Sequence, residues 1–576
     1  MPEVRLIQTN FTAGEWSPRL AGHVDLQKRA NACEELQNVI VWPHGGVTRR
    51  MGTRFRGHIK AGNTKPLLKD FSFNDIQTYV LEFGARYVRF WRDGGQIMRD
   101  DGKPLEVSLP YSADEVHELG FAQSADVLFI CHAKYLPQKL VRHGPDVFTL
   151  VPCEFLNQPE EWTHSNWPSR VNLHQQRTWW TGCPNHPQKL WFSATGNFLE
   201  MGGEAKEDDS GAGFSLDSDQ VNQIRGLVAA RNLVCLTSGG EWTLSGGNES
   251  ISPTNVQATR YSNVGCAAHV PPMLIGSAVL FMSRDRKKLR EFIYNLEQDG
   301  FVPLEASLLS EHLLRPQVKQ LAWQQDPDSI VWCVLDDGTL AAMTYLRDQQ
   351  VYAWHRHTTQ GKVLSVCANS AEDYTEIWLA VERNGKVCME QMANPWQGDN
   401  LDDADCFFVD SGLSYQGSKL SSVSGLDHLN GMTVQVLADG GVQKEKVVQN
   451  GRIDLDFPAD TVVVGLGYEY RVTPLQPEGG SPLGTGQGVI KRMSKVTIRT
   501  YKSVGMHYKI GDDTEKDIFL RNVNKAMEKP VQPFTGDLEL PSVGTGWDSN
   551  PTVSVFGSDP LPFSLLALIR QVEVTA

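Results

Sequence analysis

The sequence predicts an all-β protein with a β-propeller core of about seven blades, an additional C-terminal domain of β-sandwich or barrel-like form, and a short N-terminal helix. Three observations lead to this prediction. Short runs rich in Val, Leu, Phe, Tyr and Trp are separated by turns drawn from 51 Gly and 30 Pro, a composition typical of all-β proteins. Helical periodicity is scarce. A strand–turn–strand unit also recurs along the first 400 residues.

The recurring unit has a start-to-start spacing of 46 to 54 residues. A period of roughly 40–50 residues with several strands per unit is typical of a propeller blade, because blades stack to cover their faces and close into a ring. A sandwich with evenly spaced hairpins is the alternative. The third unit fits least well, since Pro184 and Pro187 suit a turn better than a strand interior. The seven units begin at Gln77, Asp126, Arg177, Arg231, Ser277, Ser329 and Thr375.

Three segments carry helix signals. The longest is residues 25–39, which gives the predicted N-terminal helix. Residues 114–119 follow Ser112, which precedes Glu115 by three positions and predicts a capping box. A third short helix is predicted near residues 221–227.

The chain divides into three predicted regions. Residues 1–70 hold the N-terminal helix and a docking strand, residues 71–400 form the propeller, and residues 401–576 form one or two C-terminal β-rich domains. In this last region the strands are longer and lack the blade period. The dipeptide Asp439-Gly440 predicts a tight hairpin there.

Charge is distributed unevenly along the chain. The net charge of the 576 residues is -14, yet residues 1–100 contain 15 Lys and Arg against 10 Asp and Glu. This surplus of five positive charges leaves -19 for the other 476 residues. An acidic body argues against tight nucleic-acid binding, which needs clustered cations. It is compatible with DNA passing nearby without adhering.

The bulk composition predicts a soluble globular protein, with a mean hydropathy of -0.32. No run of about 18 apolar residues occurs, so no membrane span is expected. The N-terminus lacks the pattern of a signal peptide, which predicts a cytosolic chain. The ten cysteines include no Cys-x-x-Cys pair and are expected to be buried free thiols rather than disulfides or zinc ligands.

Weak metal and nucleotide motifs do not amount to a site. Gly484–Gly488, with the sequence GTGQG, lacks the Lys-Ser/Thr ending of a phosphate loop and is expected to be a mobile loop. His355 and His357 share a strand face, but no third metal ligand lies nearby, and a solvated strand end is the alternative. An acidic cluster lacks the Gly and terminal Glu of a calcium loop, so neither metal nor cofactor is expected. That cluster comprises Asp399, Asp402, Asp403 and Asp405.

Catalytic motifs are also missing from the sequence. Neither Gly-x-Ser-x-Gly nor His-Glu-x-x-His occurs. Sialidase propellers repeat a Ser-x-Asp-x-Gly-x-Thr-Trp turn, and the nearest approach, at Thr237–Thr243, lacks the Asp and does not recur. Two catalytic carboxylates can be far apart in the sequence and close together in the fold, and such a pair cannot be recognised from the sequence. We therefore expect no enzyme, with a glycan-degrading propeller as an open alternative.

A set of segments in order along nearly the whole chain resembles one family. FTAGEWSP, WPHGG and RRMGTRF follow Asn10, and GEWTLSGGNESISPTNVQATRYSNVGC begins at Gly240. LREFIYNLEQDGFVPLEASLLSEHLL begins at Leu289, AWHRHTTQGKVLSV at Ala353 and VVVGLGYEYRVTPL at Val462. This set resembles the tail nozzle proteins, also called tail tubular protein B, of short-tailed, podovirus-type bacteriophages. The GYEYRV sequence departs from the family, where a Pro-Tyr followed by a small residue is common.

The resemblance implies a structural virion protein of the phage tail, assembled in the host bacterial cytoplasm. Such proteins form the distal tail tube as a homo-oligomer, expected to be a hexameric ring, below the portal and the adaptor protein. They offer attachment surface to tail fibre or spike proteins and let phage DNA pass during ejection without binding it specifically. The family implies no catalytic residue, cofactor or metal. A kelch-like interaction propeller and a glycan-degrading tail enzyme stay open as alternatives.

Residues 41–59 contain four arginines within eight positions. Trp42-Pro43 and Gly45-Gly46 predict a turn, and a strand is predicted from Val47, with Arg50, Arg54, Arg56 and His58 on a basic face and Arg49 as the exception on the apolar face. The face is either solvated, or it docks to carboxylates of a neighbouring subunit or the adaptor. Direct contact with DNA is less favoured, because an isolated cationic stripe in a conduit would slow the genome. The candidate docking residues are Arg49, Arg50, Arg54 and Arg56.

Overall fold

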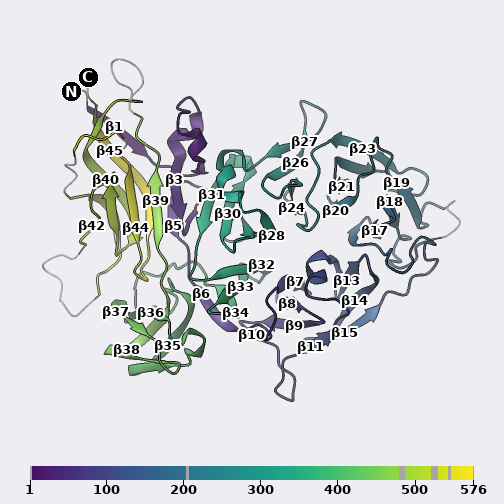
Figure 1. Ribbon diagram of the computed structural model, residues 1–576, viewed down its shortest axis with the longest axis horizontal. Coiled ribbons are helices and arrows are strands. Elements are labelled where there is room, and N and C mark those ends of the chain that lie inside the picture. The colour runs from purple at the N-terminus through teal and green to yellow at the C-terminus, as the bar shows by residue number, and fades with distance from the viewer. Residues whose placement is uncertain are drawn as a thin grey trace.

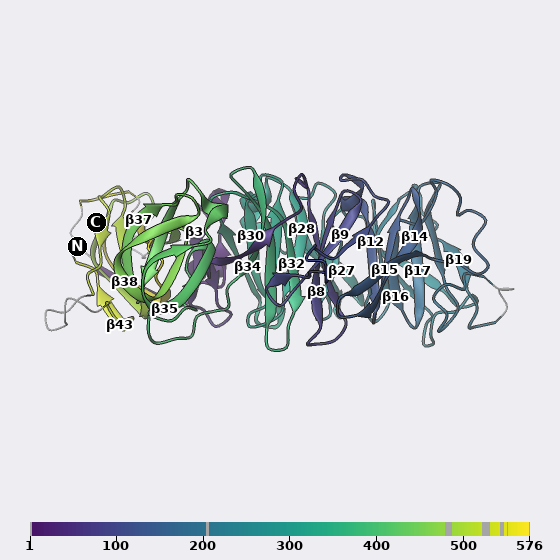
Figure 2. The same cartoon turned by 90° about the horizontal axis from the view of Figure 1, so that it is seen from below.

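The computed structural model describes residues 3–202, 207–478, 487–520, 530–541, 546–549 and 551–574. Almost all of its regular structure is β-strand. Seven antiparallel blades surround a central axis at one end of the molecule, and C-terminal β-sheets pack at the other end (Figure 1). Seen from the side, the two parts form one long, flat body (Figure 2). The predicted all-β propeller with an additional C-terminal β-rich domain is confirmed.

Blades 1 to 5 are separate sheets in chain order. Blade 1 consists of β7 (Leu67–Ser72), β8 (Thr78–Gly84) and β9 (Tyr87–Arg92), with β10 (Gly95–Gln96) and β11 (Glu106–Ser108) both paired to β9. Blade 2 consists of β12 (Gly120–Ser124), β13 (Val127–His132), β14 (Tyr135–Gly144) and β15 (Val147–Pro152). Blade 3 consists of β16 (Arg170–His174), β17 (Arg177–Cys183), β18 (His186–Phe192) and β19 (Ala212–Ser215). Blade 4 consists of β20 (Ile224–Ala229), β21 (Leu233–Thr237), β22 (Glu241–Ser245) and β23 (Gln257–Ser262). Blade 5 consists of β24 (Met273–Ile275), β25 (Ala278–Met282), β26 (Leu289–Asn295) and β27 (Gly300–Glu305).

Blades 6 and 7 lie next to the C-terminal domain. Blade 6 consists of β28 (Val318–Gln324), β29 (Ile330–Leu335), β30 (Leu340–Leu346) and β31 (Val351–His357). Blade 7 consists of β32 (Lys362–Ser370), β33 (Thr375–Arg383), β34 (Lys386–Met392) and β6 (Thr53–His58). Each predicted repeat unit is the middle hairpin of a blade. Pro184 lies in the turn of the third hairpin as expected, but Pro187 lies in β18, against the prediction.

The N-terminal part of the chain closes the propeller. β6 forms the outer strand of blade 7 by pairing antiparallel with β34, from Thr53 opposite Met392 to His58 opposite Cys388. The ring therefore joins a strand that precedes blade 1 to strands that end the propeller. A hydrophobic cluster between blades 7 and 1, which includes Trp91 and Trp378, fills the seam. Similar clusters fill each of the other six interfaces between neighbouring blades in the described chain.

The sheets of blades 6 and 7 continue into the C-terminal domain. β31 pairs parallel with β3 (Ala32–Gln37), which leads to β39 (Tyr470–Pro474), β44 (Val553–Gly557), β41 (His507–Ile510) and β42 (Lys516–Asp517), with β2 (Gly14–Glu15) beside β3. β6 pairs parallel with β35 (Asp410–Ser424), which leads to β38 (Arg452–Leu466), β36 (Thr433–Ala438) and β37 (Gly441–Val447). A further sheet holds β4 (Val39–Val41), β5 (Val47–Arg49), β45 (Ser564–Val574), β40 (Lys491–Ser503) and β43 (Phe534–Glu539), with β1 (Glu3–Gln8) paired to β45.

Helices are short in the described chain. The N-terminal helix predicted over residues 25–39 is only a 3-10 turn, followed by β3 and β4, because strand pairing with β39 and β31 overrides local propensity. The helix predicted near residues 221–227 is wrong, since β20 begins there. Glu115 does accept hydrogen bonds from the backbone and hydroxyl of Ser112, but the N-cap of η3 is Asp114, whose side chain makes no capping hydrogen bond. The 3-10 helices are η1 (Pro18–Leu20), η2 (Gln27–Asn31), η3 (Glu115–Glu118), η4 (Leu308–Leu314), η5 (Arg347–Gln349) and η6 (Asp427–Leu429).

Two further sequence predictions are confirmed. The Asp439-Gly440 turn joins β36 to β37, and both residues have positive φ, as a type I′ hairpin requires. All ten cysteines are free and buried. Among the described residues, no helix is long and apolar enough to cross a membrane.

Candidate functional site

The predicted docking strand at residues 47–59 is two strands. β5 ends at Arg49 and β6 begins at Thr53, and the two belong to different sheets. Gly52 lies between them against the backbone of Val409, where an added Cβ atom would come within 2.0 Å of the carbonyl oxygen. Only glycine fits this close approach. The chain therefore changes from the C-terminal domain to blade 7 at Gly52.

Arg50 forms a buried ion pair with Asp410. Its two Nη atoms donate to the carboxylate oxygens over 2.8 and 2.7 Å, and its Nε donates to Asn38 Oδ1 over 3.0 Å. Asp410 also accepts from Thr359 Oγ1 over 2.7 Å. Burial opposes ionisation of Asp410, but the guanidinium and these hydrogen bonds keep its pKa below the usual value. The pair links the β5–β6 connection to the first residue of β35.

Arg49 is held by carbonyl oxygens and an aromatic ring. It donates to the carbonyl oxygens of Leu561 over 3.0 Å, of Tyr468 over 2.8 Å, and of Asp559. Its guanidinium carbon lies 4.5 Å from the centre of the Tyr468 ring. These contacts fasten β5 to the C-terminal domain.

Arg54 and Arg56 are half-buried on β6. Arg54 pairs with Asp405 over 2.8 Å and stacks on Phe407, with 4.3 Å from its guanidinium carbon to the ring centre. Arg56 Nε donates to Gln391 Oε1 over 2.9 Å, across the pairing with β34. Arg54 thus contacts the segment that follows blade 7, and Arg56 contacts β34 within blade 7.

The direct docking role predicted for Arg49 and Arg50 is wrong. Their side chains are only 1% and 4% exposed and their partners lie within the same chain, so a neighbouring subunit cannot reach them. A solvated basic face is wrong for Arg50, which is buried. For Arg54 and Arg56, docking stays a prediction. We call the region where residues 14–59 meet blade 7 and the C-terminal domain the joint.

Two carboxylates of the joint were missed by sequence reasoning. Glu15 is fully buried; it accepts from the backbone N–H of Leu36 over 2.9 Å, contacts His312 Nε2 over 2.8 Å, and pairs with Arg356. Glu390 is also fully buried. It accepts from Arg383 over 2.5 and 2.8 Å and from Thr53 over 2.5 Å. These contacts couple β33 and β34 to β6 within blade 7. An ionisable residue inside an apolar strand, such as Glu390 in KVCMEQM, is the signal that marks such a site.

His355 and His357 are buried rather than at a solvated strand end. His355 Nδ1 lies 2.7 Å from His357 Nε2, and burial lowers the pKa of His355 to about 3 and that of His357 well below its usual value. The end of β31 is covered because β3 pairs alongside it. Within the described chain, no group of three or more His, Cys, Asp or Glu side chains is placed to hold a metal ion.

The other weak motifs have structural contacts. Asp399 of the acidic cluster pairs with Lys502 over 2.7 Å, and Asp405 pairs with Arg54. In the turn compared with sialidases, the Glu241 carboxylate accepts from the backbone N–H of Gly265 over 2.7 Å. Most of the GTGQG loop lies outside the described residues.

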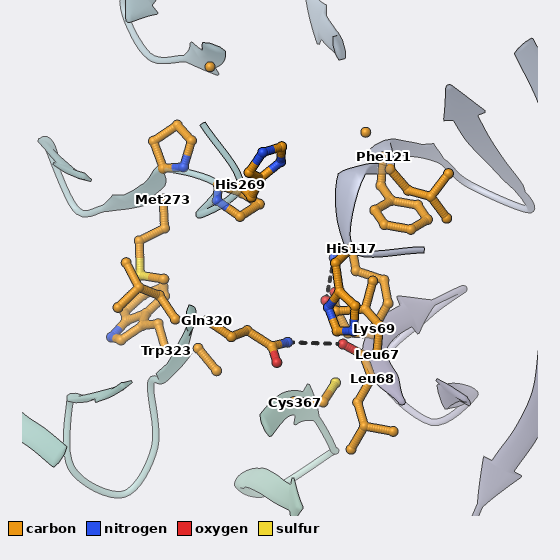
Figure 3. Close-up of a pocket in the computed structure, with 18 of the residues that line it drawn as sticks. Leu67, Leu68, Lys69, His117, Phe121, His269, Met273, Gln320, Trp323 and Cys367 are labelled. Atoms are coloured by element: carbon orange, nitrogen blue, oxygen red, sulfur yellow. Dashed lines mark hydrogen bonds and ion pairs between the residues drawn. The ribbon is translucent and has the colours of Figure 1, made fainter. Parts of the chain in front are cut away.

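A cavity of about 500 Å³ lies on the propeller axis. The innermost strand of every blade contributes to its wall: β7, β12, β16, β20, β24, β28 and β32. Figure 3 shows His117 and Phe121 on one side and His269, Met273 and Trp323 on the other. The Gln320 amide donates to the carbonyl oxygen of Leu68 over 3.2 Å and crosses between blades 6 and 1.

Positive groups predominate in this cavity. Arg170, Arg225 and Lys319 line it, and none of them forms an ion pair in the described chain. Asp70 also lines the cavity, but it pairs with the neighbouring Lys69. Burial lowers the pKa of Lys319, and it lowers the pKa of both arginines.

The cationic groups are positioned by backbone carbonyls. Arg170 donates to the carbonyl oxygens of Arg225 over 2.9 Å, of Glu118 over 2.8 Å and of Ala268 over 2.7 Å. Arg225 donates from Nη1 to the carbonyl oxygen of Cys266 over 2.8 Å, while its buried Nε has no partner. Neutral carbonyls orient these guanidinium groups but leave their charge uncompensated.

Comparison with known proteins gives only low-identity matches among solved structures. No protein-family model matches the chain, and no curated protein matches it. Among solved structures, the RRP9 WD40 repeats match at 11% identity and a TM-score of 0.39, over 60% of this chain and 99% of that one. U3-55K matches at 11% identity and 0.37, over 58% and 98%, and the Myceliophteria thermophila Cps50 (Swd1) propeller domain at 10% and 0.35, over 58% and 98%. The sheet order of the chain itself shows a seven-bladed β-propeller with an additional C-terminal β-rich domain.

Proposed function

We propose that this protein is the nozzle subunit of a short-tailed bacteriophage, a structural virion protein of the distal tail tube. The observation that supports this proposal is the position of the segment that carries the strongest resemblance to nozzle proteins. Residues 10–55 contain Glu15, Arg49 and Arg50, three of the buried charged residues of the joint. The motif residues are therefore those that fasten the propeller to the C-terminal domain.

The joint suits a subunit that carries mechanical load. Domains linked only by a small polar interface move relative to each other by default. Here two sheets run from blades 6 and 7 into the C-terminal domain, and the Arg50–Asp410 pair lies buried between them. A body joined in this way transmits force from one ring of a tail to the next without hinge motion.

The proposed assembly is a hexameric ring attached below the adaptor protein, with tail fibres or spikes bound outside and phage DNA passing through the lumen. Such a ring needs head-to-tail contacts, in which one face of the subunit meets a different face of its neighbour. The basic N-terminal region and the acidic remainder of the chain provide charges of opposite sign for that contact. The half-buried Arg54 and Arg56 are candidates for its edge.

Electron microscopy tests the proposal. The purified chain is mixed with the portal and adaptor proteins of the same virion, and the particles are classified. We expect a ring of this protein, six-fold symmetric, on the adaptor face away from the portal. A chain that stays monomeric and never joins the adaptor contradicts the proposal and favours an interaction propeller. Release of sugar from bacterial capsule or lipopolysaccharide by the purified chain favours the glycan-degrading alternative.

A further inference from the structure

The cavity on the propeller axis holds more positive charge than its walls neutralise. Arg170, Arg225 and Lys319 converge on it from blades 3, 4 and 6, and the one carboxylate of the lining, Asp70, is paired with Lys69. A charge removed from water is costly unless a partner compensates it. In the joint the Arg50–Asp410 and Arg383–Glu390 pairs are complete, whereas none of the three cavity cations forms an ion pair within the described residues, and only the carboxylate fields of Glu118 and Asp336 reach Arg170 and Lys319.

We propose that this cavity binds a small polyanion that carries phosphate or carboxylate groups. Guanidinium and ammonium groups are the usual partners of both kinds of oxyanion, and charge-assisted hydrogen bonds to them are the stronger ones. The cavity volume of about 500 Å³ lies within the range of small-molecule sites. Met273, Pro272 and Trp323 give one wall an apolar surface for the carbon skeleton of an organic anion.

The cations have different roles in this site. The donors of Arg170 are largely occupied by carbonyl oxygens, so it contributes its charge more than its hydrogen bonds. Arg225 donates one side-chain hydrogen bond, from Nη1 to the carbonyl oxygen of Cys266, and the Lys319 ammonium makes no hydrogen bond within the described chain. Arg225 and Lys319 are therefore the residues that contact the anion.

The two histidines of the lining give the site a dependence on pH. Burial lowers the pKa of His117, aided by Lys319 and Lys65 and opposed by Asp114. Burial also lowers the pKa of His269, aided by Arg170, Arg225 and Arg286 and opposed by Glu118. A bound anion favours the protonated form of both rings, so anion binding is coupled to proton uptake by His117 and His269.

Isothermal titration calorimetry of the full chain tests the proposal, at constant ionic strength, with sodium pyrophosphate and sodium citrate as separate probes. We expect saturable binding of at least one probe at one site per chain, and weakening by about tenfold or more in Lys319→Gln. Lys444→Gln is the matched control, because Lys444 is an exposed lysine on β37, far from the cavity. Arg225→Gln provides a second variant on another blade.

The two probes distinguish the two classes of anion. Binding of pyrophosphate alone identifies a phosphate ligand, and binding of citrate alone identifies a polycarboxylate. Because Lys319 makes no hydrogen bond in the described chain, its variant is expected to melt like the native protein, which keeps the comparison valid. Absence of saturable binding by either probe overturns the proposal, as does equal weakening in the Lys319 and Lys444 variants. Ring assembly is a separate property and is unaffected by either result.

Discussion

The joint and the axial cavity both contain buried or half-buried cations, but two arginines of the joint have carboxylate partners, whereas Arg49 of the joint and the arginines of the cavity are held by carbonyl oxygens. In the joint, Arg50 and Arg383 each face a buried carboxylate, and both pairs are bidentate. In the cavity, Arg225 and Lys319 face space and no carboxylate of the described chain pairs with them. The same residue types therefore stabilise one region and leave the other with unbalanced charge. Whether a buried cation stabilises the fold depends on whether a carboxylate lies beside it.

The largest expected effect comes from breaking the central pair of the joint. Arg50→Ala leaves Asp410 buried without its counter-ion, and we expect the free energy of unfolding to fall by about 3–5 kcal/mol. Urea unfolding followed by tryptophan fluorescence measures this change. Arg452→Ala is the control, since the Arg452–Asp454 pair is exposed and its loss costs at most about 1 kcal/mol. Equal losses in the two variants would show that the buried pair contributes no more to the free energy of unfolding than the exposed pair does.

A second effect comes from the histidines beside the joint. His355 and His357 are neutral when folded, and they take up protons on unfolding once the pH falls below about 6.5. Stability is therefore complete above that pH and falls as the pH drops towards 3, by up to about 1.4 kcal/mol per pH unit for each ring. Asp410, with its lowered pKa, adds a loss only below its unfolded value of about 3.8.

The urea midpoint measured between pH 8 and pH 4.5 checks this dependence. The double variant His355→Gln, His357→Gln is expected to show a shallower decline than the native chain, because two of the groups that bind protons on unfolding are gone. An unchanged slope would place the acid sensitivity elsewhere in the molecule.

A third effect tests the change of sheet at Gly52. Gly52→Ala places a Cβ atom against the backbone of Val409, which cannot move aside as a flexible side chain can. We expect a loss of about 1–3 kcal/mol, typical of overpacking. Gly385→Ala is a useful comparison: Gly385 lies in an open turn with positive φ, so its cost is conformational and not steric. Backbone amide exchange is expected to rise in β6 for Gly52→Ala only.

The smallest effect sharpens the contrast between the two regions. Lys319→Met removes a cation that has no partner and whose pKa is lowered by burial, so we expect stability to stay constant or to rise by up to about 1 kcal/mol. The same urea assay measures it, in buffer free of polyanions. A loss comparable to that of Arg50→Ala would mean that the cavity cations are structural, like those of the joint.

Much of the fold was predictable because it is local. Each blade contributes a hairpin whose apolar strands and polar turn lie within 20 residues of each other, so the repeat is visible in the sequence. The Asp439-Gly440 turn was predictable for the same reason. The helix predicted over residues 25–39 was wrong beyond Asn31, since the strand there depends on partners more than 300 residues away.

The candidate sites were less predictable than the blades. The arginines of residues 49–56 were predicted to be solvated or to dock to another subunit or the adaptor, because the true partner of Arg50, Asp410, lies 360 residues away in the sequence. The axial cavity had no sequence signal at all. Its lining comes from the inner strand of each of the seven blades, and no two of the cations that define it belong to one motif.

The sequence by itself determined the all-β class, the blade period and the segments that resemble nozzle proteins, because these depend on residues close together in the chain. Only the tertiary structure decided where β6 closes the ring, how Arg49 and Arg50 are buried, and which cations meet on the axis. Those features depend on contacts between distant residues, and the energy of a charge is set by the burial and the partner that the fold supplies.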